Sequence, residues 1–436
     1  MGYFRAGLEA LPASPRPLEE PQAAQARFSV HHLFEGASQR LQLLSGGAVL
    51  ASAGGKDAAI HLFALRQDLP LTPVPALRGH SEAVTALAAL VSGGATSPLL
   101  ASGSRDRTVR VWDTRTSPSP LAVLRGGASS AVSCLAFLPA PLFSLAAAYA
   151  DGSLRLWESF LDGSEPDLLL PATGDAVTFL YSLPAPVEPT GAVLVSCSAA
   201  GRACLWDARG RVVGELLGHG GEVTSALLLG DGRLATGCSG DGLIRVFNLE
   251  DDAFLSTPSG GSSGEPRALA RALVAPCCTL HADHRAGGRV VLCAHPSPLT
   301  VATGLCSGGS EGAVYVWGAR EPFGQLLVTS QLANARVGAI TALSTVGDDV
   351  VVVGGGDGVL VAHFAGFSSR EVALIKGDSG GGASAAAVGV SDLVCWEDES
   401  EAGAPLPAEG SGGSGARKVA FTCAGPGGLQ SYRVFV

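Results

Sequence analysis

The sequence predicts an all-β fold made of many short strands. Apolar residues make up 47% of the 436 residues, enough to bury a large core, while charged residues make up only 16%. Glycine and proline are abundant, at 59 and 26 residues, and this composition favours short strands joined by frequent turns. A strand motif that ends in a bulky ring also returns along the chain, which indicates repeated small sheets.

The repeated motif is clearest in the segment LASGSRDRTVRVWD, which ends at Asp113. A short apolar run leads to a polar turn at Asp106, and apolar residues then alternate from Val109 to Trp112, as in a half-buried strand. Asp suits the turn because its side chain accepts hydrogen bonds from nearby backbone amides. A turn position followed six residues later by a bulky side chain occurs in eight places: Asp57 and Phe63, Asp106 and Trp112, Asp151 and Trp157, Ala200 and Trp206, Asp241 and Phe247, Glu311 and Trp317, Asp357 and His363, and Leu429 and Phe435.

Repeats of this length indicate the blades of a β-propeller. Most neighbouring copies are 41 to 49 residues apart, a period typical of units with four strands. The two longer gaps contain Gly/Ser-rich insertions, near residues 252–288 and 397–416. We therefore expect a single β-propeller over residues 28–436 with about eight four-stranded blades, and seven blades as the alternative. Residues 1–27 are rich in Pro, Ala and Glu, and we expect them to form an extended or disordered tail.

The repeat resembles the WD-repeat family. Gly79-His80 begins the second unit and Trp112-Asp113 ends it, while Gly218-His219 begins a later unit. In this family a His, a strand Ser or Thr, the turn Asp and the Trp indole form a buried hydrogen-bonded set within one blade. The resemblance implies that only the second unit offers all four residues, which are His80, Ser102, Asp106 and Trp112.

Closure of the ring is the next requirement, because an open ring would expose unpaired strand edges that promote aggregation. Propellers of the resembled family usually close by building one blade from both ends of the chain. The run Phe28–Phe34 has the pattern of a strand and precedes the first unit, and a final strand-like run lies at Ser431–Val436. We therefore expect Phe28–Phe34 to be the outer strand of the last blade, beside Ser431–Val436.

Composition and motifs argue against several classes of function. The formal net charge is −10 and no dense basic stripe occurs, so nucleic acid is not expected as the principal partner. No apolar run approaches the roughly 18 residues of a membrane span, and no secretory signal is found. We expect no membrane partner and an intracellular location, in the cytoplasm first and otherwise in the nucleus or a cilium. No phosphate-binding loop that ends in Gly-Lys-Ser or Gly-Lys-Thr occurs, and neither catalysis nor a cofactor is expected.

One segment raises the question of a metal. The sequence CCTLHADH places Cys277, Cys278, His281 and His284 close together, and thiolates and imidazoles are good zinc ligands. Adjacent Cys residues on a strand point to opposite faces, however, and no Cys-x-x-Cys pair occurs. The alternative to a metal site is a strand and loop with buried free thiols. The absence of a Cys-x-x-Cys pair favours this alternative.

A rigid ring that projects many loops suits a non-catalytic scaffold that binds other proteins in a heteromeric complex. Arg105 and Arg107, in the polar turn of the second unit, are candidate contacts. The tetrapeptides that end at Arg115 and Arg209 resemble the Trp-Asp-x-Arg box of substrate receptors of cullin–RING ubiquitin ligases, in which the Arg contacts the ligase adaptor. The resemblance implies an adaptor-binding role for both arginines; the alternative is that they are solvated residues beside a turn.

Overall fold

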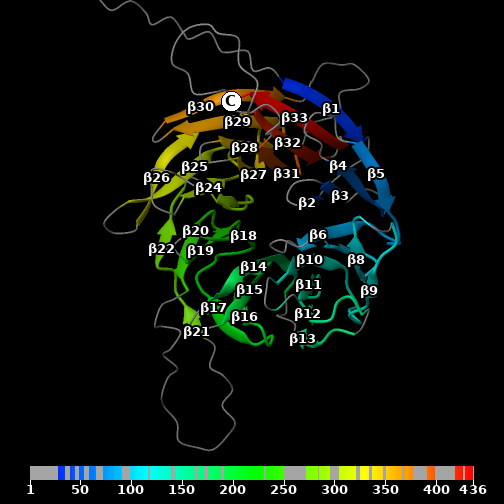
Figure 1. Ribbon diagram of the computed structural model, residues 1–436. Helices are drawn as coiled ribbons and strands as arrows, with labels where there is room; N and C mark the ends of the chain where they lie inside the picture. Colours follow the sequence, from blue (N-terminus) through cyan, green and yellow to red (C-terminus); the bar gives the residue numbers. More distant parts are fainter. Residues whose placement is uncertain are drawn as a thin grey trace, which may run out of the picture.

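The computed structural model is a ring of small twisted sheets around a central axis (Figure 1). The structure describes residues 28–34, 40–44, 49–53, 58–64, 72–90, 99–115, 118–138, 142, 144–162, 165–170, 175–187, 191–229, 232–249, 272–282, 284–294, 304–320, 325–332, 336–346, 350–365, 368–376, 390–397, 418–425 and 428–435. Strands and turns account for this part of the chain. No helix of a length and apolarity that could cross a membrane occurs in these ranges.

The strands form eight sheets, and each sheet is one blade of a propeller. Within a blade the chain runs antiparallel from an inner strand at the ring centre to an outer strand at the rim (Figure 1). Blade 1 contains β2 (Arg40–Leu44), β3 (Val49–Ala53), β4 (Ile60–Ala64) and β5 (Thr72–Leu77), and blade 2 contains β6 (Val84–Leu90), β7 (Leu99–Ser104), β8 (Val109–Asp113) and β9 (Ala122–Leu124). Blade 3 contains β10 (Val132–Phe137), β11 (Leu145–Tyr149), β12 (Leu154–Trp157) and β13 (Leu168–Leu170), and blade 4 contains β14 (Val177–Val187), β15 (Ala192–Ser198), β16 (Ala203–Asp207) and β17 (Val212–Leu216).

The second half of the ring repeats this order with one interruption. Blades 5 to 8 contain β18 (Val223–Leu228), β19 (Arg233–Cys238), β20 (Ile244–Asn248) and β22 (Cys278–Leu280); β23 (Val291–Ala294), β24 (Gly304–Gly308), β25 (Val314–Arg320) and β26 (Gln325–Leu332); β27 (Ile340–Val346), β28 (Val350–Gly355), β29 (Gly358–Ala365) and β30 (Ser368–Lys376); and β31 (Asp392–Glu397), β32 (Lys418–Gly425), β33 (Gly428–Phe435) and β1 (Phe28–Phe34). The predicted all-β propeller with eight blades is confirmed, and the seven-blade alternative is wrong.

The last blade contains strands from both ends of the described chain, as predicted. Strand β1 pairs antiparallel with β33, and the register places Phe28 opposite Val434 and His32 opposite Gln430. Strands β31 and β32 complete the same sheet. A polar contact also joins blade 8 to blade 1, because the Leu41 backbone N–H donates to an Asp392 carboxylate oxygen at 2.9 Å. The ring is therefore closed through backbone pairing at the rim and a side-chain contact at the centre.

The bulky side chain of the repeated motif occupies the same place in each blade where it is described. In six blades it lies on the third strand, directly opposite a leucine of the second strand, and is at most 4% exposed. The pairs are Phe63 and Leu50, Trp112 and Leu100, Trp157 and Leu145, Trp206 and Leu194, Phe247 and Leu234, and Trp317 and Leu305. The recurrence in the sequence therefore corresponds to a recurrence in space.

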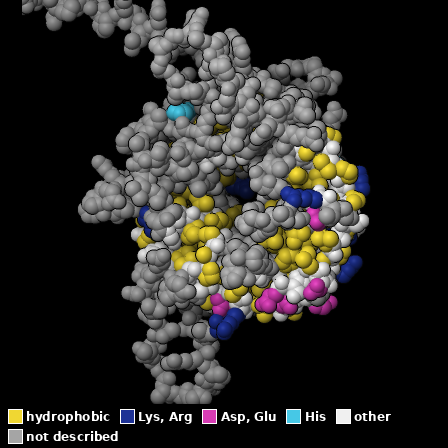
Figure 2. Space-filling model, in the orientation of Figure 1, with side chains coloured by type: hydrophobic (Ala, Val, Ile, Leu, Met, Phe, Trp, Pro, Cys, Tyr) yellow, Lys and Arg dark blue, Asp and Glu magenta, His cyan; other side chains and the backbone are white. Residues whose placement is uncertain are grey.

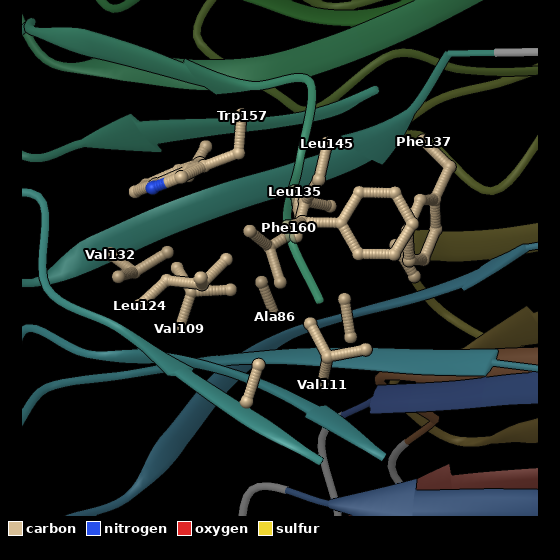
Figure 3. Packing of buried hydrophobic residues seen from close by; sticks show 14 of the residues in the cluster. Ala86, Val109, Val111, Leu124, Val132, Leu135, Phe137, Leu145, Trp157 and Phe160 are labelled. Atoms are coloured by element: carbon tan, nitrogen blue, oxygen red, sulfur yellow. The ribbon is translucent and has the colours of Figure 1, made fainter. Parts of the chain in front are cut away.

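The hydrophobic core is divided among the junctions between blades. In the cluster between blades 2 and 3, Val109 and Val111 of β8 face Trp157 and Leu135 of the next blade (Figure 3). Similar clusters occupy the junctions from blades 1 and 2 through blades 7 and 8. Burial of these large side chains is worth about 1.5–3 kcal/mol each. A blade is therefore stable mainly through its contact with its neighbours.

Threonine side chains add a hydrogen bond across several of these junctions. Each is the second residue of its inner strand and donates to a backbone carbonyl at the start of the next inner strand or within two residues before it. The four examples are Thr85 to Val132 at 2.6 Å, Thr178 to Val223 at 3.2 Å, Thr224 to Val290 at 2.7 Å, and Thr341 to Val390. These bonds fix neighbouring inner strands relative to each other where they line the central channel.

One blade differs from the predicted four strands. After β20 the chain returns to blade 4, where β21 (Ala272–Val274) pairs in parallel with the outer strand β17. The Leu217 backbone N–H extends this pairing by donating to Val274 O at 2.9 Å. The chain then supplies β22 as the outer strand of blade 5. The difference arises because the outer edge of a sheet offers unpaired N–H and C=O groups that a passing segment can bind.

Removal of residues 1–35 is expected to destabilise the whole protein, because it deletes β1 and leaves β33 with an unpaired edge. Six residue pairs join the two strands, and with about 1 kcal/mol for each net hydrogen bond the loss is on the order of 5 kcal/mol. Thermal denaturation followed by circular dichroism measures it. The matched control is deletion of residues 1–27, which keeps β1 and should melt like the full chain. Equal melting temperatures for the two deletions would show that closure does not depend on β1.

Candidate functional site

Blade 2 contains a connected chain of buried hydrogen bonds. The Trp112 indole N–H donates to Ser102 Oγ at 2.8 Å, and Ser102 Oγ lies 2.7 Å from His80 Nε2. The other ring nitrogen, His80 Nδ1, lies 2.9 Å from Asp106 Oδ2. A carboxylate can only accept, so His80 Nδ1 carries the proton and its Nε2 accepts from the Ser102 hydroxyl. These four residues are the set that the resemblance implied.

Asp106 also organises the turn between β7 and β8. Its carboxylate accepts hydrogen bonds from the Thr108 amide at 2.9 Å, the Thr108 hydroxyl at 2.6 Å and the Ser81 amide at 3.0 Å. Burial alone would raise the pKa of Asp106, but the hydrogen bonds from Thr108 and His80 lower it to about 2. Burial also lowers the pKa of His80 below its usual value of 6.5. The network therefore contains an ionised Asp106 and a neutral His80 at pH 7.

Blade 6 contains a second network of this kind, in which Glu311 stands at the turn position where the predicted set has an Asp. The Trp317 indole N–H donates to Ser307 Oγ at 2.9 Å, and His284 Nε2 lies 3.1 Å from the same oxygen. His284 Nδ1 is hydrogen-bonded to Glu311. The sequence signal was the distance of 23 residues from His284 to Ser307, close to the 22 from His80 to Ser102. It was missed because Glu replaces Asp and the histidine does not follow a glycine.

The other blades keep only parts of the network. In blade 4 the Trp206 indole donates to Ser196 Oγ at 2.8 Å, and in blade 5 His219 Nε2 lies 2.8 Å from Thr236 Oγ1. In blade 3 the buried Trp157 indole N–H has no hydrogen-bond partner among the described residues. Ala147 stands at the position that Ser102 occupies in blade 2, since both lie two residues after the leucine opposite the tryptophan. The blades therefore differ in how completely their buried polar groups are satisfied.

The predicted cluster of Cys277, Cys278, His281 and His284 is not gathered around one point. His284 belongs to the network of blade 6, Cys278 lies in β22 and pairs with Val246, and His281 is exposed. Among the described residues, which leave out Asp283, no group of three or more His, Cys, Asp or Glu side chains is placed to hold a metal ion. Cys277 is exposed, and hydrogen bonding to Cys278 together with the nearby Arg233 lowers its pKa to about 6.

The four candidate arginines lie on opposite faces of the ring. We call the face on which the inner strands begin the upper face and the other the lower face. Arg105 and Arg107 lie in the turn between β7 and β8, on the upper face, while Arg115 lies in the turn after β8, at the opposite end of that strand. Arg209 follows β16 in the equivalent turn of blade 4, so it shares the lower face with Arg115. All four side chains are exposed.

The two Trp-Asp-x-Arg tetrapeptides have the same local structure. The backbone N–H of Arg115 donates to Asp113 Oδ1 at 2.9 Å, and the backbone N–H of Arg209 donates to Asp207 Oδ1 at 3.0 Å. In this type of turn the aspartate accepts from the amide two residues later, which fixes the backbone. Blade 3 separates the two turns, so the lower face presents two arginines in matching local settings.

A hollow lies at the centre of the ring. It has a volume of about 580 Å³ and is bordered by inner strands from blade 1 to blade 5 and by the segment before β23. Lys or Arg side chains are visible in the central opening (Figure 2). Two arginines, Arg40 and Arg289, border this cavity together with Glu222. Sequence reasoning did not single out any of these three residues.

The fold and the blade networks define an eight-bladed β-propeller, and comparison with known proteins gives its family. The family model "WD domain, G-beta repeat" matches residues 71–113, 118–158 and 210–248. The chain is a WD-repeat β-propeller. Each matched segment combines the outer strand of one blade with three strands of the next, as in 71–113, which contains β5 and then β6 to β8.

Solved structures show the same fold at low sequence identity. The crystal structure of Sqt1 from Saccharomyces cerevisiae is 16% identical with a TM-score of 0.64, over 93% of this chain and 98% of that chain. The computationally designed Ika8 protein is 19% identical with a TM-score of 0.60, over 92% of this chain and 97% of that chain. No curated protein matches the sequence.

Replacement of Trp112 by Phe is expected to cost about 1 kcal/mol more than replacement of Trp157 by Phe, because of these two indoles only that of Trp112 donates a hydrogen bond to a described residue. Both indoles are fully buried, so the two changes remove similar apolar volume. Urea denaturation of the two variants measures the difference in the free energy of unfolding. Equal losses would mean that the network in blade 2 adds nothing to stability.

Acidification is expected to destabilise the protein through His219. Burial lowers the pKa of His219 to about 4, and the charge of Arg245 adds to this effect, whereas in the unfolded chain the pKa is 6.5. Protons therefore bind the unfolded state more tightly, and the stabilisation is complete above pH 6.5 and is lost as the pH falls towards 4. The loss is on the order of 3 kcal/mol.

The urea midpoint between pH 7 and pH 4.5 tests this expectation. It should fall less in His219→Gln than in the wild type. Replacement of the exposed His281 by Gln serves as the control and should leave the wild-type slope unchanged. If His219→Gln had the same slope as the wild type, His219 would not be a source of the acid sensitivity.

Proposed function

We propose that this protein is a non-catalytic scaffold that binds other proteins on both faces of its ring, as a subunit of a heteromeric complex. The observation that carries the proposal is the separation of exposed arginines between the two faces of a rigid frame. Arg105 and Arg107 lie on the upper face, and Arg115 and Arg209 lie on the lower face. Exposed arginines are frequent anchors in protein interfaces.

The rigidity of the frame supports this role. The blade 2 network holds the turn that carries Arg105 and Arg107, because Asp106 is bound by Thr108, Ser81 and His80. Arg107 has a φ of 69°, a conformation that is unfavourable for a side chain other than glycine. A turn held in one conformation loses little entropy on binding, which favours affinity.

The cysteines support an intracellular location. The nine cysteines with described side chains are thiols and form no disulfide. Free thiols are typical of reducing compartments such as the cytoplasm and the nucleus. We propose the cytoplasm as the principal location, with the nucleus or a cilium as alternatives.

Charge reversal on one face at a time tests the scaffold proposal. The pair Arg105→Glu with Arg107→Glu should lose an upper-face partner, and the pair Arg115→Glu with Arg209→Glu should lose a lower-face partner. Loss of a binding arginine typically weakens an interface by about tenfold or more. Native co-purification with quantitative mass spectrometry measures each partner, and thermal denaturation of the variants should be unchanged because the side chains are exposed. A wild-type chain without stoichiometric companions would contradict the proposal.

A more specific alternative is a substrate receptor of a cullin–RING ubiquitin ligase. It is favoured by the matching turns that present Arg115 and Arg209 on the same face. Direct binding of the purified chain to the ligase adaptor tests it, and the lower-face variant pair should abolish that binding while the upper-face pair keeps it. An adaptor that fails to bind the wild type removes this alternative and leaves the scaffold proposal untouched.

A further inference from the structure

The central cavity has features of a small-molecule site that the scaffold proposal does not use. Its volume of about 580 Å³ lies within the range of roughly 300–1,000 Å³ found for ligand pockets. Part of its wall is apolar and comes from neighbouring inner strands, with Leu135 on β10 and Phe179 and Leu180 on β14. Basic side chains are seen in the same opening (Figure 2).

Two guanidinium groups border the cavity, and one of them lacks a partner. Arg40 donates from Nε to Thr85 O at 3.2 Å. Arg289 makes no hydrogen bond or ion pair with any residue in the described ranges. Arg289 is exposed, so the five N–H donors of its guanidinium are accessible to a ligand that enters the cavity. Burial lowers the pKa of Arg289, and the positive charge of Arg40 lowers it further, so the two arginines are close enough to repel each other.

The nearby carboxylates do not occupy the N–H donors of Arg289. Asp392 is already hydrogen-bonded, since its two oxygens accept from the Leu41 and Leu393 backbone N–H groups, each at 2.9 Å. Glu222 borders the cavity and attracts Arg289, but its carboxylate makes no hydrogen bond with a described residue. The cavity lining has two positive side chains, Arg40 and Arg289, and one negative side chain, Glu222, so it suits a ligand with a single anionic group and not a polyanion.

We propose that the central cavity binds a small molecule that carries one phosphate or carboxylate group, held by Arg289 and Arg40, and an apolar body that packs against Leu135, Phe179 and Leu180. Carboxylates and phosphates match the paired N–H groups of a guanidinium, which gives short charge-assisted hydrogen bonds. The apolar wall supplies the hydrophobic contact. This site is separate from the loops on which the scaffold proposal rests.

Calorimetric titration with three matched probes tests the site on the full chain. Phenyl phosphate and benzoate carry the two anionic groups on the same ring, and benzyl alcohol is the neutral control. We expect one of the anions, or both, to bind to wild-type protein at millimolar concentration, and the stronger of the two identifies the preferred group. Absence of binding by both anions, or equal binding of benzyl alcohol, would overturn the proposal.

Variants then test which residues hold the anion. Arg289→Gln should weaken binding of the preferred anion by roughly tenfold, the effect of losing a charge-assisted hydrogen bond. Glu222→Gln should strengthen binding, because it removes a negative charge beside the ligand, and this gain would be seen even if Arg289→Gln failed to fold. Arg125→Gln alters an exposed arginine that does not line the cavity and should bind like the wild type. Unchanged affinity in both cavity variants would refute the assignment.

Discussion

The contact between neighbouring blades at the ring centre is the constraint on which the rest of this structure depends. At four junctions a glycine in the second strand of one blade receives a β-branched side chain from the next. A Cβ added to the glycine would lie within 3 Å of that side chain in each pair: Gly103 and Val132, Gly237 and Val290, Gly308 and Ile340, and Gly354 and Val390. The space is filled to the density of a protein interior, so an added methyl group would force the blades apart.

This constraint explains how much of the fold could be predicted from the sequence. A blade that packs against the same kind of neighbour needs the same side chains at the same spacing, and Trp112, Trp157, Trp206 and Trp317 all recur opposite a leucine for this reason. The closing strand was predictable because an unpaired edge at β33 would be unfavourable. Alternation with period two and a fixed unit length were sufficient for the number of blades, whereas the closure was predicted from the resemblance to the WD-repeat family.

Features without a local pattern could not be predicted in this way. Strand β21 is only three residues long and takes its partner from another blade, so no alternation indicates it. The network of blade 6 uses Glu311, whose longer side chain reaches His284 from the turn where other blades have Asp. Arg40 and Arg289 are far apart in the chain, and they meet only because both lie near the start of an inner strand. Eight such starts converge on one axis, which no single repeat reveals.

The pairing of β1 with β33 has a consequence for biosynthesis. The strand Phe28–Phe34 is synthesised about 400 residues before its partner β33. At about 5–20 residues per second, the first strand waits on the order of 20–80 s for its place in a sheet. Throughout that interval the nascent chain has a free apolar strand and incomplete blades, which are features that chaperones bind. The native ring thus closes only after the β32–β33 hairpin has been made.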